Sequence, residues 1–432
     1  MTWEFLQVRN RRRLIGAAGA VGAAAALTAA ALAANAGSAG AADVPVLTTV
    51  PYTAVAGSDG GLTRPGGVAA AGGTVYVSNA GDSVVAALSG GNTSIIAGSL
   101  ENFGEHGDGG QATAATLYHP GGTAVDAKGD IFIADSGDNV VREITSGGVI
   151  KRFAGTGSAR GLSLAPRATL ASLDYPEGVA TNASGDVFIA DTFNNRVVEV
   201  TPSGSMRAVA GTGKAGYSGD GHSATHAALN TPTGVAVDAQ GNVYIADASN
   251  NVIRRVDAKT GVITTVAGDF AADKANDGLG GFSGDGGPAT SAQLNDPQGV
   301  AVDGAGDLFI ADTFNNAIRE VKPDGTISTV VNAAPAAGGI PPAGGESSGK
   351  AATASKLNTP YAVAVDPAGV LYIADTKNNA IASVSGLVQS GSGGGASASP
   401  SAGSSDSASP SNSASTSPTG SASASPSASA NS

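Results

Sequence analysis

The sequence predicts an all-β protein, a six-bladed β-propeller built from four-stranded antiparallel blades. Three observations support this fold class: six copies of one sequence pattern, four short strand-like segments in a complete copy, and 64 glycines with only 4% aromatic residues in a chain of 432. A composition of this kind is typical of turn-rich β proteins rather than helical ones. Repeated four-stranded units cannot bury both sheet faces alone, so they must stack on their neighbours.

The first 42 residues are interpreted as an export segment and are left out of the fold. Arg9, Arg11, Arg12 and Arg13 precede an Ala- and Gly-rich apolar stretch at 14–34, which ends among small residues. This order predicts an export signal, and the arginine run resembles a twin-arginine signal. The segment is either cleaved or retained as a membrane anchor. Both outcomes place the remaining chain outside the cytoplasm, secreted in the first case and tethered to the cell surface in the second.

Charge and cysteine content exclude several classes of function. The chain contains no cysteine, so it has neither a structural disulfide nor thiol chemistry. The export segment holds four arginines and one glutamate, so the net charge changes from -12 to -15 when it is removed. This acidity argues against nucleic acid and anionic membrane surfaces as partners.

The repeat occupies residues 46–388 and is aligned by a proline in each copy. Its fourth copy reads most clearly, with strand-like segments at 232–238, 241–247, 250–256 and 262–268. A glycine stands two places after the proline in five copies, and a leucine three places before it in all six. We expect the small residues to let the innermost strands approach the axis closely, and the leucines to fill the junctions between blades. The aligned prolines are Pro65, Pro120, Pro176, Pro232, Pro297 and Pro360.

Aspartate and asparagine recur where the second strand of a copy ends. The fourth copy has Asp247 followed by Asn250 and Asn251. Short polar side chains cap their own backbone and tolerate a left-handed conformation, so we interpret this set as turn chemistry.

The two ends of the repeat region are expected to share one blade. The sixth copy lacks a fourth strand after Ile381–Val384, whereas Thr53–Gly57 resembles the fourth strands of other copies. We therefore predict that this N-terminal strand completes the last blade and closes the ring, leaving no long strand edge exposed.

These motifs resemble the NHL repeat. The resemblance rests on Pro232–Asp238, on Tyr244–Asp247 and on Asn250–Arg254, and the stretch Gly281–Thr290 is similar to secreted bacterial members and to the NHL portion of teneurins. It implies a six-bladed propeller. For function it implies a range of roles, because related propellers serve as protein or RNA binders, as extracellular sensor domains and as lyases.

Residues 389–432 form a tail of Ser, Ala, Gly and Pro with one charge, Asp406. Such a segment buries too little apolar surface to offset its ordering entropy, so we expect it to be disordered.

Three of the long connections between copies share a Gly-Asp-Gly motif. Asp108, Asp220 and Asp285 occupy its centre, and each motif is followed by Ala-Thr-x-Ala-x-Leu. We interpret the latter half as a short helical turn that delivers the leucine, with the aspartate near the helix start, where its charge is favoured. The alternative is Ca²⁺ binding through carboxylate and carbonyl oxygens.

All four histidines lie in these same connections: His106, His119, His222 and His226. We interpret them as polar substitutions, because no third ligand or companion acid is evident from their spacing. The alternative is a Zn²⁺ site or a general base, which would make the protein a metal-dependent lyase or hydrolase of the propeller type.

Aromatic residues are few and several belong to the long connections. Tyr and Phe are enriched at recognition surfaces, which makes these residues candidates for ligand binding. The candidates are Tyr118, Phe193, Tyr217, Phe282, Phe314 and Tyr361.

The sequence favours a non-catalytic binding or scaffolding propeller that presents its long connections to a protein, a peptide or a cell-wall glycan. Long loops on a rigid scaffold are where such folds carry function. We expect a monomer without a required cofactor.

Overall fold

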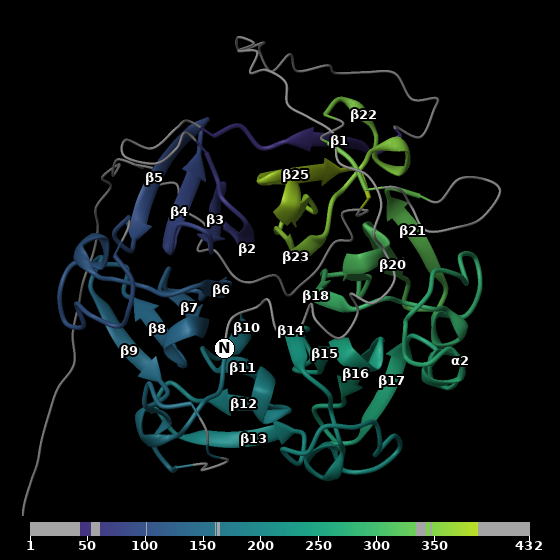
Figure 1. Cartoon of the computed structure of the whole chain (residues 1–432), viewed down its shortest axis with the longest axis horizontal. Helices are drawn as coiled ribbons and strands as arrows, with labels where there is room; N and C mark the ends of the chain where they lie inside the picture. The colour runs from purple at the N-terminus through teal and green to yellow at the C-terminus, as the bar shows by residue number, and fades with distance from the viewer. Residues whose placement is uncertain are drawn as a thin grey trace, which may run out of the picture. The chain divides into compact units, whose positions relative to one another are not determined.

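The computed structural model describes residues 44–52, 61–100, 102–159, 161, 165–333, 343–345 and 348–387. They form six antiparallel sheets arranged around one axis, with their first strands innermost (Figure 1). The six-bladed, all-β prediction is confirmed. The predicted export segment and tail lie outside the described residues.

Each blade runs outward from the axis in the order of its strands. Blade 1 contains β2 (Pro65–Ala71), β3 (Thr74–Asn79), β4 (Val84–Ser89) and β5 (Asn92–Ala97). Blade 2 contains β6 (Pro120–Val125), β7 (Ile131–Asp135), β8 (Val140–Ile144) and β9 (Ile150–Ala154). Blade 3 contains β10 (Pro176–Thr181), β11 (Val187–Asp191), β12 (Arg196–Val200) and β13 (Met206–Ala210). Blade 4 contains β14 (Pro232–Val237), β15 (Val243–Asp247), β16 (Val252–Val256) and β17 (Ile263–Ala267). Blade 5 contains β18 (Pro297–Val302), β19 (Leu308–Asp312), β20 (Ala317–Val321) and β21 (Ile327–Val331).

Blade 6 joins the two ends of the chain, as predicted, but with a different strand from the one expected. It contains β23 (Pro360–Val365), β24 (Leu371–Asp375), β25 (Ala380–Ser385) and β1 (Val46–Thr49), and the short β22 (Lys350–Ala351) pairs with the outer edge of β1. The prediction that Thr53–Gly57 fills this place is wrong, because β24 and β1 already occupy both edges of β25. Residues 53–57 themselves lie outside the described part of the chain.

A closer sequence match would have identified the closing strand. Val46–Val50 reads Val-Leu-Thr-Thr-Val, which matches Val262–Val266 of blade 4, Val-Ile-Thr-Thr-Val. The backbone agrees: the Ala352 N–H donates to Pro45 O at 2.8 Å, just as the Ala224 N–H donates to Gly261 O at 2.9 Å in blade 4. The closing strand therefore makes the contacts of an ordinary fourth strand.

Apolar side chains pack between neighbouring blades rather than within one. Leu117 is fully buried in a cluster that includes Val85 of blade 1 and Ile133 of blade 2. The other five repeat leucines are also buried, at 0 to 5% exposure. The prediction that these leucines fill the junctions is confirmed, and burial of each contributes on the order of 2 kcal/mol.

The glycines beside the axis are required by close contact. A Cβ at Gly67 would lie 2.3 Å from Gly121 O, and one at Gly178 would lie 2.2 Å from Thr233 O. No side chain fits at such distances, so the first strands of adjacent blades approach as closely as the sequence predicts.

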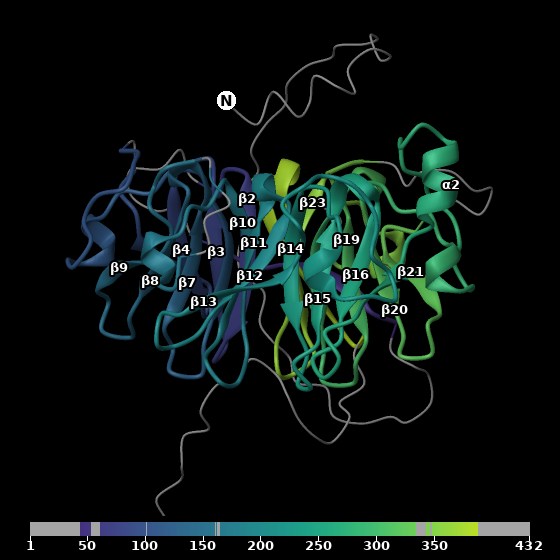
Figure 2. The ribbon, with the colours of Figure 1, turned by 90° about the horizontal axis from the view of Figure 1, so that it is seen from below.

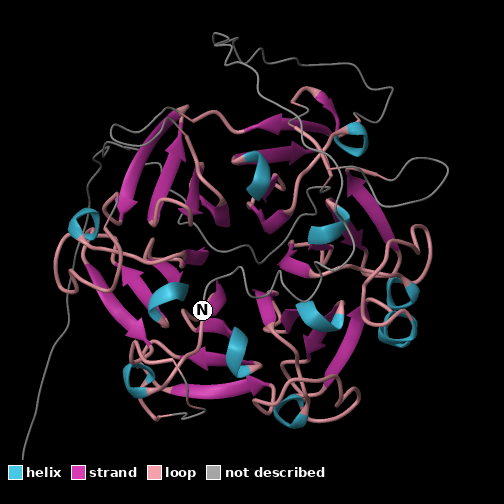
Figure 3. Ribbon diagram, in the orientation of Figure 1, coloured by secondary structure: helices cyan, strands magenta, loops and turns pink. Residues whose placement is uncertain are grey.

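The two ends of the axis differ. The face where first strands begin, here called the long-loop face, carries the connections between blades, including α2 (Phe270–Ala275) (Figure 2). The other short helical elements of the described residues are single 3-10 turns, which lie in the connections between blades and between the second and third strands of blades 2 to 6 (Figure 3). On the opposite turn face, β1 begins at Val46 beside Ser385, near the end of β25. Within the described residues no helix has the length and apolar character needed to cross a membrane.

Candidate functional site

The residue before each aligned proline has a left-handed backbone. The values of φ at these six places lie between 48° and 54°. This conformation is costly for residues other than glycine, above all for β-branched ones, and the surrounding structure must hold it in place. The six residues are Arg64, His119, Tyr175, Thr231, Asp296 and Thr359.

The backbone N–H of each of these residues donates a hydrogen bond to a side chain of the preceding blade. The N–H of Tyr175 donates to Asn139 Oδ1 at 2.9 Å, and the N–H of Asp296 donates to Asn251 Oδ1 at 2.7 Å. Equivalent bonds occur at all six junctions, with Ser83 replacing the asparagine between blades 1 and 2. The asparagines are left-handed, as predicted, with φ between 50° and 58°. Their second role, as clamps between blades, was not predicted.

The side chains at this end of the axis differ from blade to blade, although the backbone repeats. The residue after the proline is Gly66, Gly121, Glu177, Thr233, Gln298 or Tyr361. Residues that serve the fold recur in every copy, so positions whose residue type varies among the copies are candidates for function. We define the axial cluster as Tyr175, Glu177, Asp296, Gln298 and Tyr361.

One hydrogen bond in the axial cluster joins opposite blades. The Tyr361 hydroxyl of blade 6 donates to Glu177 Oε2 of blade 3 at 2.9 Å. These blades stand three places apart in a ring of six, so the contact crosses the axis. Tyr361, predicted as a ligand-binding aromatic, therefore lies at the centre of the long-loop face.

Burial alters the acidity of this cluster. It raises the pKa of Glu177 to about 7; the Tyr361 hydrogen bond opposes this change and the nearby Asp296 adds to it. Burial also raises the pKa of Asp296 to about 6, with a hydrogen bond from Gln298 opposing it. The pKa values of Tyr175 and Tyr361 are raised by burial and by Glu177. Carboxyls that titrate near neutrality are common at functional sites, where they bind cations or transfer protons.

Blades 1 and 2 contribute basic groups to the same end of the axis. Arg64 is exposed. His119 lies next to Tyr118, with ring centroids 4.7 Å apart, and its pKa is lowered by burial and by Arg64. The residues after the prolines here are Gly66 and Gly121, which add no side chain. A Cβ at Gly66 would have only ordinary contacts, 3.5 Å to Ala80 Cβ and to Pro120 O.

The aspartates of the Gly-Asp-Gly motifs form ion pairs with buried arginines. Asp108, Asp220 and Asp285 accept from Arg142, Arg254 and Arg319 at 2.7, 2.6 and 2.8 Å. These arginine side chains are fully buried, while the aspartates are 37 to 42% exposed. The predicted short turns follow as 3-10 helices, with Pro288 immediately before Ala289–Ser291. The arginine partners were missed. The sequence contained a signal for this pairing. The arginines stand at the same strand position in the three copies that follow a loop with the motif.

Each buried arginine also reaches the aspartate that ends the second strand. Arg254 lies 3.3 Å from Asp247, whose other oxygen accepts from the Asn230 N–H at 2.7 Å. Burial raises the pKa of Asp247 to about 6, and these hydrogen bonds and Arg254 oppose the change. The predicted turn chemistry is thus part of a buried polar network that includes Asn250.

Most other predicted aromatics pack against the network or against each other. Tyr217 and Phe282 lie under Arg254 and Arg319, with 4.7 Å from the guanidinium carbon to the ring centroid. Tyr217 also stacks on Phe270 of α2 at 3.8 Å. Phe193 is 39% exposed and stacks on Tyr175 at 5.2 Å, whereas Phe314 is half-buried.

The histidines belong to two separate connections. His106 and His119 follow blade 1, and His222 and His226 follow blade 3. His222 and His226 are exposed, and His222 Nδ1 lies 3.0 Å from Asp220 O. Within the described ranges no three His, Cys, Asp or Glu residues are grouped in a way that could hold a metal ion.

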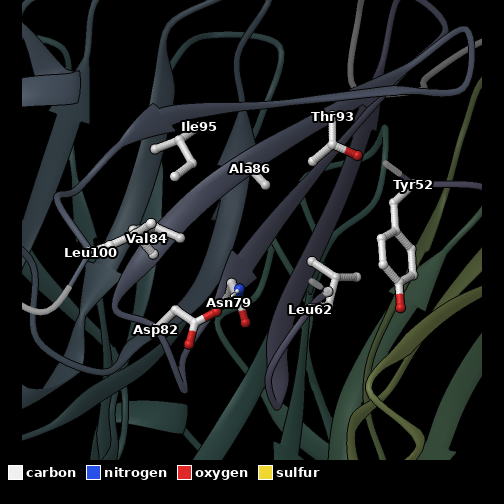
Figure 4. Close-up of a pocket in the computed structure, with 10 residues that line it drawn as sticks. Tyr52, Leu62, Asn79, Asp82, Val84, Ala86, Thr93, Ile95 and Leu100 are labelled. Atoms are coloured by element: carbon white, nitrogen blue, oxygen red, sulfur yellow. Dashed lines mark hydrogen bonds between the residues drawn. The ribbon is translucent and has the colours of Figure 1, made fainter. Parts of the chain in front are cut away.

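A small pocket lies beside the junction of blades 6 and 1, away from the axis (Figure 4). Tyr52, Leu62, Val84, Ile95 and Leu100 contribute to its lining. Asn79 and Asp82 form its polar edge, with Asn79 Nδ2 donating to Asp82 at 2.9 Å. Apart from this edge and Thr93, the side chains that line it are those of apolar residues and Tyr52, and the pocket is separate from the axial cluster.

Comparison with known proteins identifies relatives of the propeller. Residues 100–167, 202–277 and 276–344 match the teneurin NHL domain model, and residues 173–199 match the NHL repeat model. Teneurin-4 of Homo sapiens is 35% identical over 232 residues, which cover 50% of this chain and 8% of teneurin-4. Teneurin-3 of Mus musculus is 32% identical over 253 residues, which cover 54% of this chain and 9% of teneurin-3. The chain thus spans less than a tenth of these relatives.

Solved structures share the fold at low sequence identity. A structural genomics protein from Bacteroides thetaiotaomicron has a TM-score of 0.56 and 16% identity, covering 79% of this chain and 75% of its own. An auxiliary nutrient binding protein from the same organism has a TM-score of 0.53 and 14% identity, covering 79% and 76%.

Proposed function

Since the chain is an NHL-repeat β-propeller, we propose that it is an extracytoplasmic binding module that holds a protein, peptide or cell-wall glycan ligand on its long-loop face, at the axis. One observation carries the proposal. Blades with the same backbone present side chains there that vary from copy to copy, at and beside left-handed residues that hydrogen bonds between blades hold in place. Strained, unrepeated positions on a rigid scaffold are typical of binding sites.

The positions of the chain ends support this choice of face. The propeller begins at Val46 and its last strand ends at Ser385, and both lie on the turn face. The chain therefore enters and leaves the propeller on the face opposite the proposed binding surface. The extracytoplasmic location rests on the predicted export segment at 1–42.

Binding is favoured over the metal-dependent lyase or hydrolase by the placement of the histidines. Such an enzyme needs several ligands from different blades around one ion, whereas His222 and His226 are exposed on a single connection. The axial acids lie elsewhere, on blades 3 and 5.

The test is a binding screen with matched surface variants. Fluorescently labelled protein is applied to arrays of peptides and cell-wall glycan fragments, as wild type, Phe193→Ala and Tyr361→Phe. Lys128→Ala, at an exposed turn on the opposite face, is the control. We expect a bound class of probe whose signal falls at least tenfold in the Phe193 or Tyr361 variant and is unchanged in the control. Probes that bind all four proteins equally, or bind none, would refute the proposal, provided that circular dichroism shows every variant folded.

A further inference from the structure

The axial cluster presents hydrogen-bond acceptors that have no basic partner. Glu177 is 9% exposed, and neither it nor Asp296 forms an ion pair within the described part of the chain. The two acids are close enough for Asp296 to raise the pKa of Glu177. Buried carboxylates are normally neutralised by a cation, so their arrangement leaves a positive charge unsupplied.

An independent observation indicates that the missing group is a hydrogen-bond donor. Gln298 lies beside Asp296 and hydrogen-bonds to its carboxylate. Its side-chain oxygen Oε1 is enclosed and has no hydrogen-bond partner. An enclosed amide oxygen without a partner costs about 1–3 kcal/mol and calls for a donor from outside the protein.

The surroundings suit an alkyl chain that ends in this donor. Tyr175 and Tyr361 contribute aromatic surface, and Tyr175 stacks on the partly exposed Phe193. On the other side of the axis, Gly66 and Gly121 leave out the side chains that blades 3 to 6 place there. Methylene groups pack against aromatic rings while the charged head binds beyond them. A cation is also attracted by tyrosine faces.

We propose that the axial cluster is a binding site for the primary ammonium group of a lysine side chain in a peptide ligand. This inference rests on the proposed function. The ammonium group has three donors around one point charge, which fits acceptors on three separate residues of two blades. The planar guanidinium of arginine favours two-point contact with one carboxylate, whereas here Glu177 Oε2 already accepts from Tyr361 and the Asp296 carboxylate already accepts from Gln298. Of the other ionisable groups at the mouth, Arg64 and His119 stand on blades 1 and 2 and Tyr175 on blade 3.

The experiment measures binding of Nα-acetyl-lysine methylamide to the full chain by isothermal titration calorimetry at pH 8. The arginine analogue and CaCl₂ are the competing probes. Glu177→Gln and Asp296→Asn remove one charge each, and Gly66→Gln fills the open side of the mouth without backbone strain. Asp324→Asn, an exposed acid on the turn face, makes the same chemical change outside the cluster.

We expect the lysine probe to bind, the two charge variants to weaken it at least tenfold, and Gly66→Gln to abolish it. Asp324→Asn should bind like the wild type, and the arginine probe should bind at least tenfold more weakly. Absence of lysine binding, equal binding of arginine, or Ca²⁺ binding that alone depends on Glu177 would overturn the inference. If the array screen still yields a neutral ligand that requires Phe193 or Tyr361, the ammonium site fails while the proposed function stands.

Discussion

Two regions of this propeller contain buried charged side chains. In one region the charges are paired with opposite charges, and in the other they are not. In blades 2, 4 and 5, a fully buried arginine pairs with two aspartates, as Arg319 does with Asp285 at 2.8 Å and Asp312 at 3.2 Å. In the axial cluster, Glu177 and Asp296 form no ion pair within the described residues, and their pKa values are raised to about 7 and about 6. The first region repeats in three blades, and the second occurs once.

The difference separates charges that serve the fold from charges that are available to a ligand. In two of the three blades that lack this arginine, the repeat adjusts: blade 1 has Asn79 in place of the aspartate, and blade 3 pairs Asp191 with Arg196 from another strand position. No such adjustment neutralises Glu177. An acid that is buried without a cation destabilises the fold, and the presence of such an acid close to the strained Tyr175 indicates a role in binding.

Both regions require a closed ring, so opening it should have the largest effect. Deletion of residues 44–50 removes the fourth strand of blade 6 and exposes the edge of β25, in the same blade that carries Tyr361. We expect loss of cooperative thermal unfolding or formation of oligomers, measured by circular dichroism and size-exclusion chromatography. Deletion of 389–432 is the control and should leave the melting temperature unchanged. A monomeric 44–50 deletion with wild-type melting would contradict the closure.

Breaking one arginine network should destabilise the protein less than opening the ring does, but still strongly. Arg319→Met leaves Asp285 and Asp312 without their cation, and loss of one partner of a buried ion pair costs about 3–5 kcal/mol. The matched variant Lys322→Met removes a half-exposed lysine that pairs with Glu320 at 3.7 Å, which should cost less than about 1 kcal/mol. Urea unfolding measures both. Equal losses of unfolding free energy in the two variants would show that the network does not stabilise the fold.

Removing an axial acid should raise the free energy of unfolding above pH 7, whereas removing a network arginine lowers it. Because the pKa of Glu177 is raised from 4.5 to about 7 in the folded protein, the folded state binds this proton more tightly than the unfolded state does. Its charge therefore destabilises the protein increasingly as the pH rises from about 4.5 to about 7. Glu177→Gln should be more stable than the wild type by less than about 1 kcal/mol at pH 5 and by up to about 3 kcal/mol at pH 8.

The control for this measurement is Asp324→Asn, whose carboxyl is exposed on the turn face. Its difference from the wild type should stay constant between pH 5 and pH 8, because the pKa of Asp324 is lowered by hydrogen bonds from Thr326. A Glu177 variant that is less stable than the wild type at pH 8 would place Glu177 with the structural charges instead.

Individual residues show how far the sequence predicted the fold. The buried leucines, the glycines at the axis and the left-handed asparagines were predicted correctly, since each is set by a local requirement that recurs in every copy. The closing strand was assigned to Thr53–Gly57 instead of Val46–Thr49, because a four-residue strand carries little pattern and its true match lay seven residues earlier.

The site was predicted less well. Tyr361 was selected as an aromatic, but Glu177, Asp296 and Gln298 were not selected at all. Tyr217 and Phe282 were selected for the same reason as Tyr361, yet they cover buried arginines. Aromatic character alone does not tell a residue at the axis from one that packs within a connection.

The sequence by itself determined the number of blades, the strands of each blade except the one that closes blade 6, and the small residues beside the axis, because every copy must satisfy the same local packing. Only the tertiary structure decided which charges meet. Glu177 and Tyr361 are 184 positions apart, and their hydrogen bond exists because six blades close into a ring that places the third opposite the sixth. Contacts across that ring have no local sequence pattern, so they follow from closure and not from the repeat.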